Sequence, residues 1–208
     1  SGDIDIDGTA NLDVVDVDGA VNFAADVTYA DGADIITASA GTSNFRAGVN
    51  AGNSIASGGN YNVVVGDEAG TAITTGDQNI AIGYVALQSE DTGSRSIAIG
   101  YSALQNQNND ANNYNVGIGH EAGGAITTGV GNTFLGGLAG DATDDGNYNV
   151  AVGYASLSAN CANDNTAVGV GALEVNTAAS NTAVGRSALT ANTSGTSSVA
   201  VGHQALDS

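Results

Sequence analysis

Histidine, cysteine and lysine, which often act as catalytic bases or nucleophiles, are rare in this sequence: it has 2 histidines, 1 cysteine and no lysine. The only imidazoles belong to His120 and His203, and each directly follows a glycine that ends a short recurring phrase. At the same place, other copies of the phrase have tyrosine, valine or arginine. A position that accepts such different side chains is typical of a solvated corner and not of a general base. The sequence also lacks a Gly-x-Ser-x-Gly elbow, a phosphate-binding loop and any metal-binding spacing of Cys and His.

The thiol and the paired carboxylates are equally poor candidates for chemistry. Cys161 is the only cysteine, so it has no partner for an intrachain disulfide, and it lies in the turn-like stretch 160–163. We interpret it as a small residue in a loop. The pairs Glu90-Asp91 and Asp144-Asp145 also lie in turn-like stretches, and nothing in the sequence indicates a raised pKa or an enclosing pocket around them.

One acidic stretch resembles the first half of a calcium-binding loop, in which Asp3, Asp5 and Asp7 precede Gly8. The twelfth position is Val14, where such a loop needs a bidentate glutamate, and isoleucines alternate with the acids as in a strand. We therefore predict no calcium loop here, and weak cation binding between acidic strands of neighbouring copies remains a separate, open alternative. The sequence predicts no catalytic, cofactor-binding or metal-ligating residue, no cofactor and no enzymatic activity.

A five-residue motif occurs ten times and predicts the elements that position these side chains. It consists of a small polar residue, an apolar residue, a mostly small residue, an apolar residue and Gly. The closing glycines are residues 48, 66, 83, 100, 119, 136, 153, 169, 185 and 202, which gives steps of 16 to 19 residues. Apolar residues at i and i+2 have the period of a strand, and Gly, Asn, Asp, Ser and Thr dominate the remainder. The pattern predicts an all-β fold, a parallel β-solenoid with about 17 residues in each coil.

A second phrase follows many of these glycines, for example Tyr84-Val85-Ala86-Leu87 and Tyr101-Ser102-Ala103-Leu104. We expect its Leu to point inward against the Val and Ile side chains of the strand, so that the coil is a thin, two-walled roll. The Ala-bearing face of the strand would then lie in water in a single chain. Self-association of identical rolls is our preferred interpretation, and a wider, three-walled coil that covers both faces within one chain is the alternative.

Charge and hydropathy exclude several classes of partner. The formal net charge is −19, from 22 acidic residues against 3 arginines, with no lysine. Nucleic acids and anionic membrane surfaces would be repelled, and an extracellular or marine setting is compatible with such a surface. No stretch approaches the roughly 20 apolar residues that cross a bilayer, so we expect no membrane insertion. The abrupt ends at Ser1 and Ser208 suggest a segment of a longer polypeptide.

The chain divides by composition into residues 1–43 and 44–208. The first region alternates Asp with Ile or Val and contains Asp-Gly turns, as at Asp7-Gly8 and Asp18-Gly19, so we predict short acidic strands joined by turns. The second region holds the ten repeats. Within it, residues 60–76 and 113–129 agree at 13 of 17 positions, which indicates that a block of three coils has been duplicated.

Six of the 7 tyrosines fall into two sets. Tyr61, Tyr114 and Tyr148 precede the repeat Asn, whereas Tyr84, Tyr101 and Tyr154 follow the repeat Gly. We expect each set to stack in register along an edge of the solenoid and to stabilise it. A carbohydrate-binding stripe is the alternative.

The phrases Ser198-Val199-Ala200-Val201-Gly202 and Ser96-Ile97-Ala98-Ile99-Gly100 resemble the head repeat of trimeric autotransporter adhesins. That resemblance implies a trimer of left-handed parallel β-rolls. The longer form at 181–193, and the opening segments at 5–12 and 17–23, look more like repeats in phage tail fibres and other virion appendages. The repeat is longer than in the adhesins, and a neck and coiled-coil stalk are missing.

The expected function is therefore structural: a homotrimeric segment of a phage tail fibre or comparable virion appendage that projects a host-attachment tip and contacts host surface glycans or another receptor. A bacterial trimeric surface adhesin head, located on the cell surface, is the first alternative. A solenoid polysaccharide-degrading enzyme is the second, and the thin coil and the lack of a clustered acidic groove disfavour it.

Overall fold

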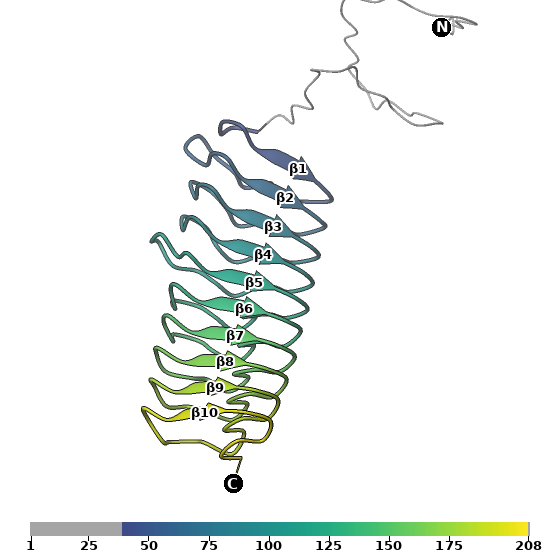
Figure 1. The fold of residues 1–208 in the computed structure, drawn as a ribbon. Coiled ribbons are helices and arrows are strands. Elements are labelled where there is room, and N and C mark those ends of the chain that lie inside the picture. The colour runs from purple at the N-terminus through teal and green to yellow at the C-terminus, as the bar shows by residue number, and fades with distance from the viewer. Residues whose placement is uncertain (1–38, 208) are drawn as a thin grey trace, which may run out of the picture. The chain divides into compact units, whose positions relative to one another are not determined.

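The computed structural model describes residues 39–207, and these form a parallel β-solenoid without helices (Figure 1). Each coil contributes one three-residue strand to a ten-stranded sheet, in which the strands follow their order in the sequence. The strands are β1 (Phe45–Ala47), β2 (Val63–Val65), β3 (Ile80–Ile82), β4 (Ile97–Ile99), β5 (Val116–Ile118), β6 (Thr133–Leu135), β7 (Val150–Val152), β8 (Thr166–Val168), β9 (Thr182–Val184) and β10 (Val199–Val201). The predicted all-β solenoid with about 17 residues per coil is confirmed for this region.

The predictions for the first 38 residues, including the calcium-like stretch that begins at Asp3, lie outside the described residues. Residues 39–43, the last five of the predicted acidic region, contain bends and no strand.

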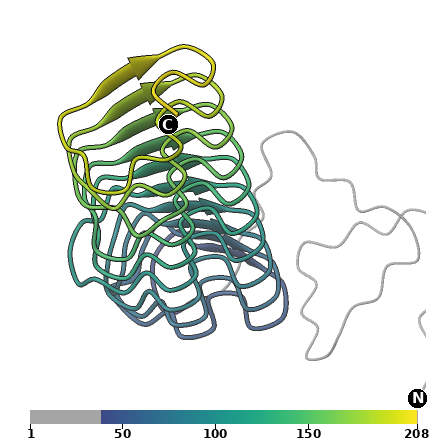
Figure 2. The same ribbon diagram turned by 90° about the horizontal axis from the view of Figure 1, so that it is seen from below.

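Seen obliquely from one end, successive coils have similar outlines and lie one behind another in chain order (Figure 2). The strands pair in parallel with equivalent residues opposite each other, as with Ala81 and Ala98 in β3 and β4. Hydrogen bonds between coils continue beyond the strands: the Gly83 N–H donates to the Val65 carbonyl at 2.8 Å, and the Val85 N–H donates to the Asp67 carbonyl at 3.1 Å. Every interior coil is therefore bonded to both of its neighbours through the backbone.

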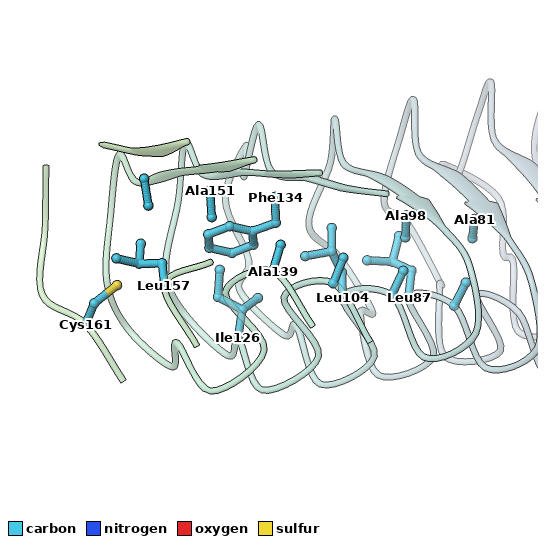
Figure 3. Close-up of a cluster of buried hydrophobic side chains, with 14 of the residues drawn as sticks. Ala81, Leu87, Ala98, Leu104, Ile126, Phe134, Ala139, Ala151, Leu157 and Cys161 are labelled. Carbon is cyan, nitrogen blue, oxygen red and sulfur yellow. The ribbon is translucent and has the colours of Figure 1, made fainter. Parts of the chain in front are cut away.

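The central residue of each strand from β2 to β10 is buried in the core, and its two neighbours point outward. Ala81 and Ala98 are fully buried, whereas Ile80 and Ile82 are partly exposed. The expectation that Ala would face outward and that Leu would pack against Val and Ile is therefore wrong. Leu does point inward, but the residues opposite it are alanines (Figure 3). The two walls lie so close that a Leu on one of them leaves room only for Ala on the other.

The coil of β6 shows the same constraint with the sizes exchanged. Here Phe134 replaces the central alanine and is fully buried. The residue after Ala139 is Gly140 in place of Leu, and a Cβ on Gly140 would lie 2.5 Å from the Phe134 ring. A large side chain on the strand is thus matched by a missing side chain on the opposite wall, as close packing requires.

The glycine that ends each strand is required by two features of its position. Gly100 has φ 134°, a region that L side chains rarely adopt, and a Cβ placed on it would lie 2.3 Å from the carbonyl oxygen of Gly119 in the next coil. A side chain would therefore strain the backbone and separate the coils.

The repeat Asn forms a buried ladder of side-chain hydrogen bonds that runs from coil to coil. The Asn79 side chain donates from Nδ2 to the Gly93 carbonyl at 2.9 Å, which closes its own coil. Its Oδ1 accepts from the Ser96 N–H of the next coil at 2.9 Å. The asparagines with this pair of roles are Asn44, Asn62, Asn79, Asn115, Asn132, Asn165 and Asn181. This role of the asparagine is a finding of the structure that strand periodicity alone did not predict.

We predict that Asn132→Ala lowers the free energy of unfolding by about 2 to 4 kcal/mol, because it leaves two buried backbone groups without partners. These groups are the Gly146 carbonyl and the Asn149 N–H, each 2.8 Å from the Asn132 amide. Urea denaturation followed by circular dichroism measures the effect. The matched control is Asn108→Ala at an exposed site, and equal stability of the two variants would contradict a structural role for the ladder.

Candidate functional site

The two histidines lie at exposed corners that follow Gly119 and Gly202. The His120 ring stacks on the Tyr101 ring with centroids 4.9 Å apart and an angle of 11° between the planes. His203 places its Nε2 3.3 Å from Nη1 of Arg186 in the preceding coil. Neither arrangement pairs an imidazole with a nucleophile or a carboxylate, which a general base needs.

Glu90, in contrast, is fully buried. Its carboxylate accepts hydrogen bonds from the Gly93 N–H at 2.8 Å, from Gln107 Nε2 at 2.8 Å and from Asn113 Nδ2 at 2.9 Å. Burial raises the pKa of Glu90, and the hydrogen bonds from Gln107 and Gly93 oppose the shift. The expectation that no carboxylate of the Glu90-Asp91 pair is enclosed or shifted is therefore wrong for Glu90.

Glu90 belongs to a cluster with Ser96 and Gln107 that replaces one rung of the asparagine ladder. The coil of β4 begins with Ser96, whose side chain is too short to span the coil. Gln107 fills the space: its Nε2 lies 2.8 Å from Ser96 Oγ, and its Oε1 accepts from Asn115 Nδ2 at 2.8 Å. Glu90 then accepts from the same Gln107 amide. The cluster closes the ladder around a short residue and offers no open space for a substrate.

Cys161 and the Asp144-Asp145 pair complete the list of candidate residues. Cys161 lies outside the strands, as expected, but its side chain is buried in the core, with Sγ 3.3 Å from Thr143 Oγ1. Burial raises the pKa of this thiol, which makes it a poor nucleophile. Asp144 and Asp145 are exposed, and Asp144 accepts a hydrogen bond from Thr127 Oγ1.

One shallow pocket of the described region has a volume of about 260 Å³. It lies outside the strands, and its lining includes Gln105, Glu121 and Asp141. Burial raises the pKa of Asp141, and Glu121 contributes to the same shift. The pocket is open, its lining is mixed polar and apolar, and no nucleophile and base are in contact in it, so it has no arrangement for catalysis.

The outward face of the sheet is an aliphatic surface that runs along all ten coils. It is formed by the first and third residues of the strands, most of which are Val, Ile or Thr and partly exposed. At the end of the solenoid, Val199 and Val201 of β10 are 68% and 70% exposed. Contiguous apolar surfaces of this kind are typical of sites of association.

Tyrosines flank this face in two columns, of which only one is stacked. The residues after the repeat Gly include Tyr84 and Tyr101, with ring centroids 5.8 Å apart, and then His120. In the other column, Arg95 lies over the Tyr114 ring at 5.8 Å. The predicted stacking in register is therefore found for part of one column, and it includes a histidine that we had not assigned to it.

Comparisons of the chain with protein-family models, curated proteins and solved structures found no match. Among residues 39–207, no group of three or more His, Cys, Asp or Glu side chains could hold a metal ion. The same described residues contain no helix long and apolar enough to cross a membrane. The candidate functional site is therefore the surface made by the aliphatic face and its aromatic columns.

We predict that the stabilisation of the fold by Glu90 depends on pH. Because its pKa in the folded chain is raised above the ordinary 4.5, the folded state holds this proton more tightly than the unfolded state. The contribution is present in full below pH 4.5 and is lost as pH rises through the raised pKa. The free energy of unfolding of the native chain minus that of Glu90→Gln should therefore be larger at about pH 4 than at about pH 8.

Urea denaturation of both proteins across this pH range measures that difference. The contributions of the other ionisable groups cancel, because both proteins contain them. Glu174→Gln, at an exposed carboxylate, serves as the control. The same pH profile in both variants would contradict the assignment to Glu90.

Proposed function

We propose that this chain is a structural, non-enzymatic fibre protein: a segment of a phage tail fibre or comparable virion appendage, built as a homotrimer of left-handed β-rolls. Its role is to project a host-attachment tip. The observation that carries the proposal is the continuous aliphatic face of the sheet along the whole described solenoid.

Identical rolls suit this face because its chemistry repeats along the axis. Each coil presents the same two outward positions, so the surfaces of sister chains match wherever the coils are level. The face contains β-branched side chains and no lysine or glutamate, a composition typical of the core of an obligate interface. We had expected the Ala-bearing face to lie between chains; because that face is buried in the core, the outward Val and Ile face lies between chains instead in this proposal.

A solenoid also suits a projecting shaft. Each coil contacts only its neighbours, so length increases by adding or duplicating coils. The duplicated segments 60–76 and 113–129 illustrate this, because Ile73 and Ile126 occupy equivalent buried positions in them. The acidic, lysine-free composition keeps such a shaft soluble and prevents binding to nucleic acid.

We predict that native mass spectrometry gives three times the chain mass for the native protein and a large fraction of single chains for Ile99→Glu. A carboxylate at this central position of the face would be buried without a partner between chains. Asn106→Glu, at an exposed site away from the strands, is the matched control. A native protein of single-chain mass would overturn the trimer.

We predict that antibodies against residues 44–208 label appendages of purified virions in electron microscopy. Labelling of a bacterial cell surface in the absence of virions would instead favour the adhesin head. Release of reducing ends from host polysaccharide by the purified chain would contradict a non-enzymatic role.

A further inference from the structure

One coil interrupts the aromatic column that follows the repeat glycines. The column contains Tyr84, Tyr101 and His120 in consecutive coils, and Tyr154 two coils after His120. The intervening coil, that of β6, has Gly137 at this position. We infer that the gap at Gly137 is a binding slot for one ring of a neutral sugar, between the rings of His120 and Tyr154.

The backbone does not explain this glycine. Gly137 does not adopt the left-handed conformation that favours glycine, unlike the neighbouring Gly136 with φ 139°. Apart from its chain neighbours, a Cβ on Gly137 would meet only ring atoms of Tyr154, at 3.6 and 4.0 Å. These are ordinary contact distances, so the position has room for a side chain, and every other coil carries one there. What the glycine provides is space.

The other column also has a glycine in this coil, and the contrast supports the assignment. The φ of 70° at Gly131 does not by itself require glycine, because other coils hold a non-glycine residue at this position with a similar φ, for example Tyr114 at 52° and Tyr148 at 58°. A Cβ on Gly131 would, however, lie 2.7 Å from the Tyr148 ring, so the neighbouring ring already fills that space. At Gly137 the nearest ring atom lies 3.6 Å from the Cβ position, and the space is open.

The spacing of the coils suits a single ring. Positions two coils apart are separated by roughly 9.6 Å along the axis, so a flat ring between them lies about 4.8 Å from each level. That value is close to the 4.9 Å between the Tyr101 and His120 centroids. The bound ring would thus continue the stacking that Tyr84, Tyr101 and His120 already show.

Charge and exposure select the ligand class. Nucleobases stack on such rings, but the phosphates that accompany them are repelled by a chain of net charge −19. A neutral hexose has an apolar C–H face for stacking and hydroxyl groups that remain in water. Both Tyr154 and His120 are exposed, so a sugar at the end or the side of a glycan can reach the slot. The inference rests on the proposed function only in that an attachment fibre meets host glycans.

The two histidines make the test specific, because only His120 lies at the slot. We expect the imidazole Cε1–Hε1 NMR signal of His120 to shift saturably as cellohexaose or chitohexaose is added at millimolar concentration. The His203 signal should stay in place and acts as an internal control. The absence of a saturable His120 shift with both oligosaccharides would overturn the proposal.

Three variants identify the slot as the binding site. Gly137→Tyr completes the column and should abolish the ligand-induced shift. Val49→Tyr introduces a tyrosine at the equivalent position of the β1 coil and should leave the ligand-induced His120 shift unchanged. Tyr154→Ala should weaken binding by about tenfold or more through loss of stacking. Undiminished binding by Gly137→Tyr would overturn the slot.

Native mass spectrometry of the same samples separates this inference from the proposed function. A trimer that shows no His120 shift removes the sugar slot and leaves the fibre standing. A single-chain native protein with a specific His120 shift removes the trimer and supports the slot.

Discussion

The whole structure depends on each coil being held in register with the next by hydrogen bonds that pass between equivalent residues. Backbone bonds alone would allow adjacent coils to slip, because one short parallel strand resembles another. The buried asparagine prevents this, since its amide closes its own coil while its oxygen binds the backbone of the following coil. Slippage by one residue would bury these polar groups without partners, at a cost of a few kcal/mol in each coil.

Register in turn fixes which residues are available to other molecules. The core is so narrow that the strand contributes one small residue to it, and the opposite wall contributes Leu where the strand has Ala. The larger Val and Ile side chains therefore lie outside, where they form a surface instead of a core. In a single chain this arrangement leaves apolar area in water, and the hydrophobic effect then favours association through that face.

The repeat made the solenoid predictable from sequence, because a strand period, a fixed step and the closing glycines all indicate the same architecture. The direction of the strand side chains was not predictable from the pattern, since Ile80, Ala81 and Ile82 are all apolar and either face suits a core. The buried state of Glu90 was hidden for a different reason. It depends on Ser96 and Gln107, residues that lie together only once the coils are stacked. The His120 stack with Tyr101 likewise follows from alignment between coils.

Stacked coils also explain how a local site arises without a new fold. Substitutions at an outward position leave the ladder and the core unchanged, so each column can vary from coil to coil while the backbone stays the same. The position after the repeat glycine carries Tyr, His, Val, Asp, Arg and Gly in different coils. Where the backbone does not require a glycine, as at Gly137, the missing side chain changes only the surface. Chemical variety in this protein is therefore expected along its columns, and uniformity is expected in its core.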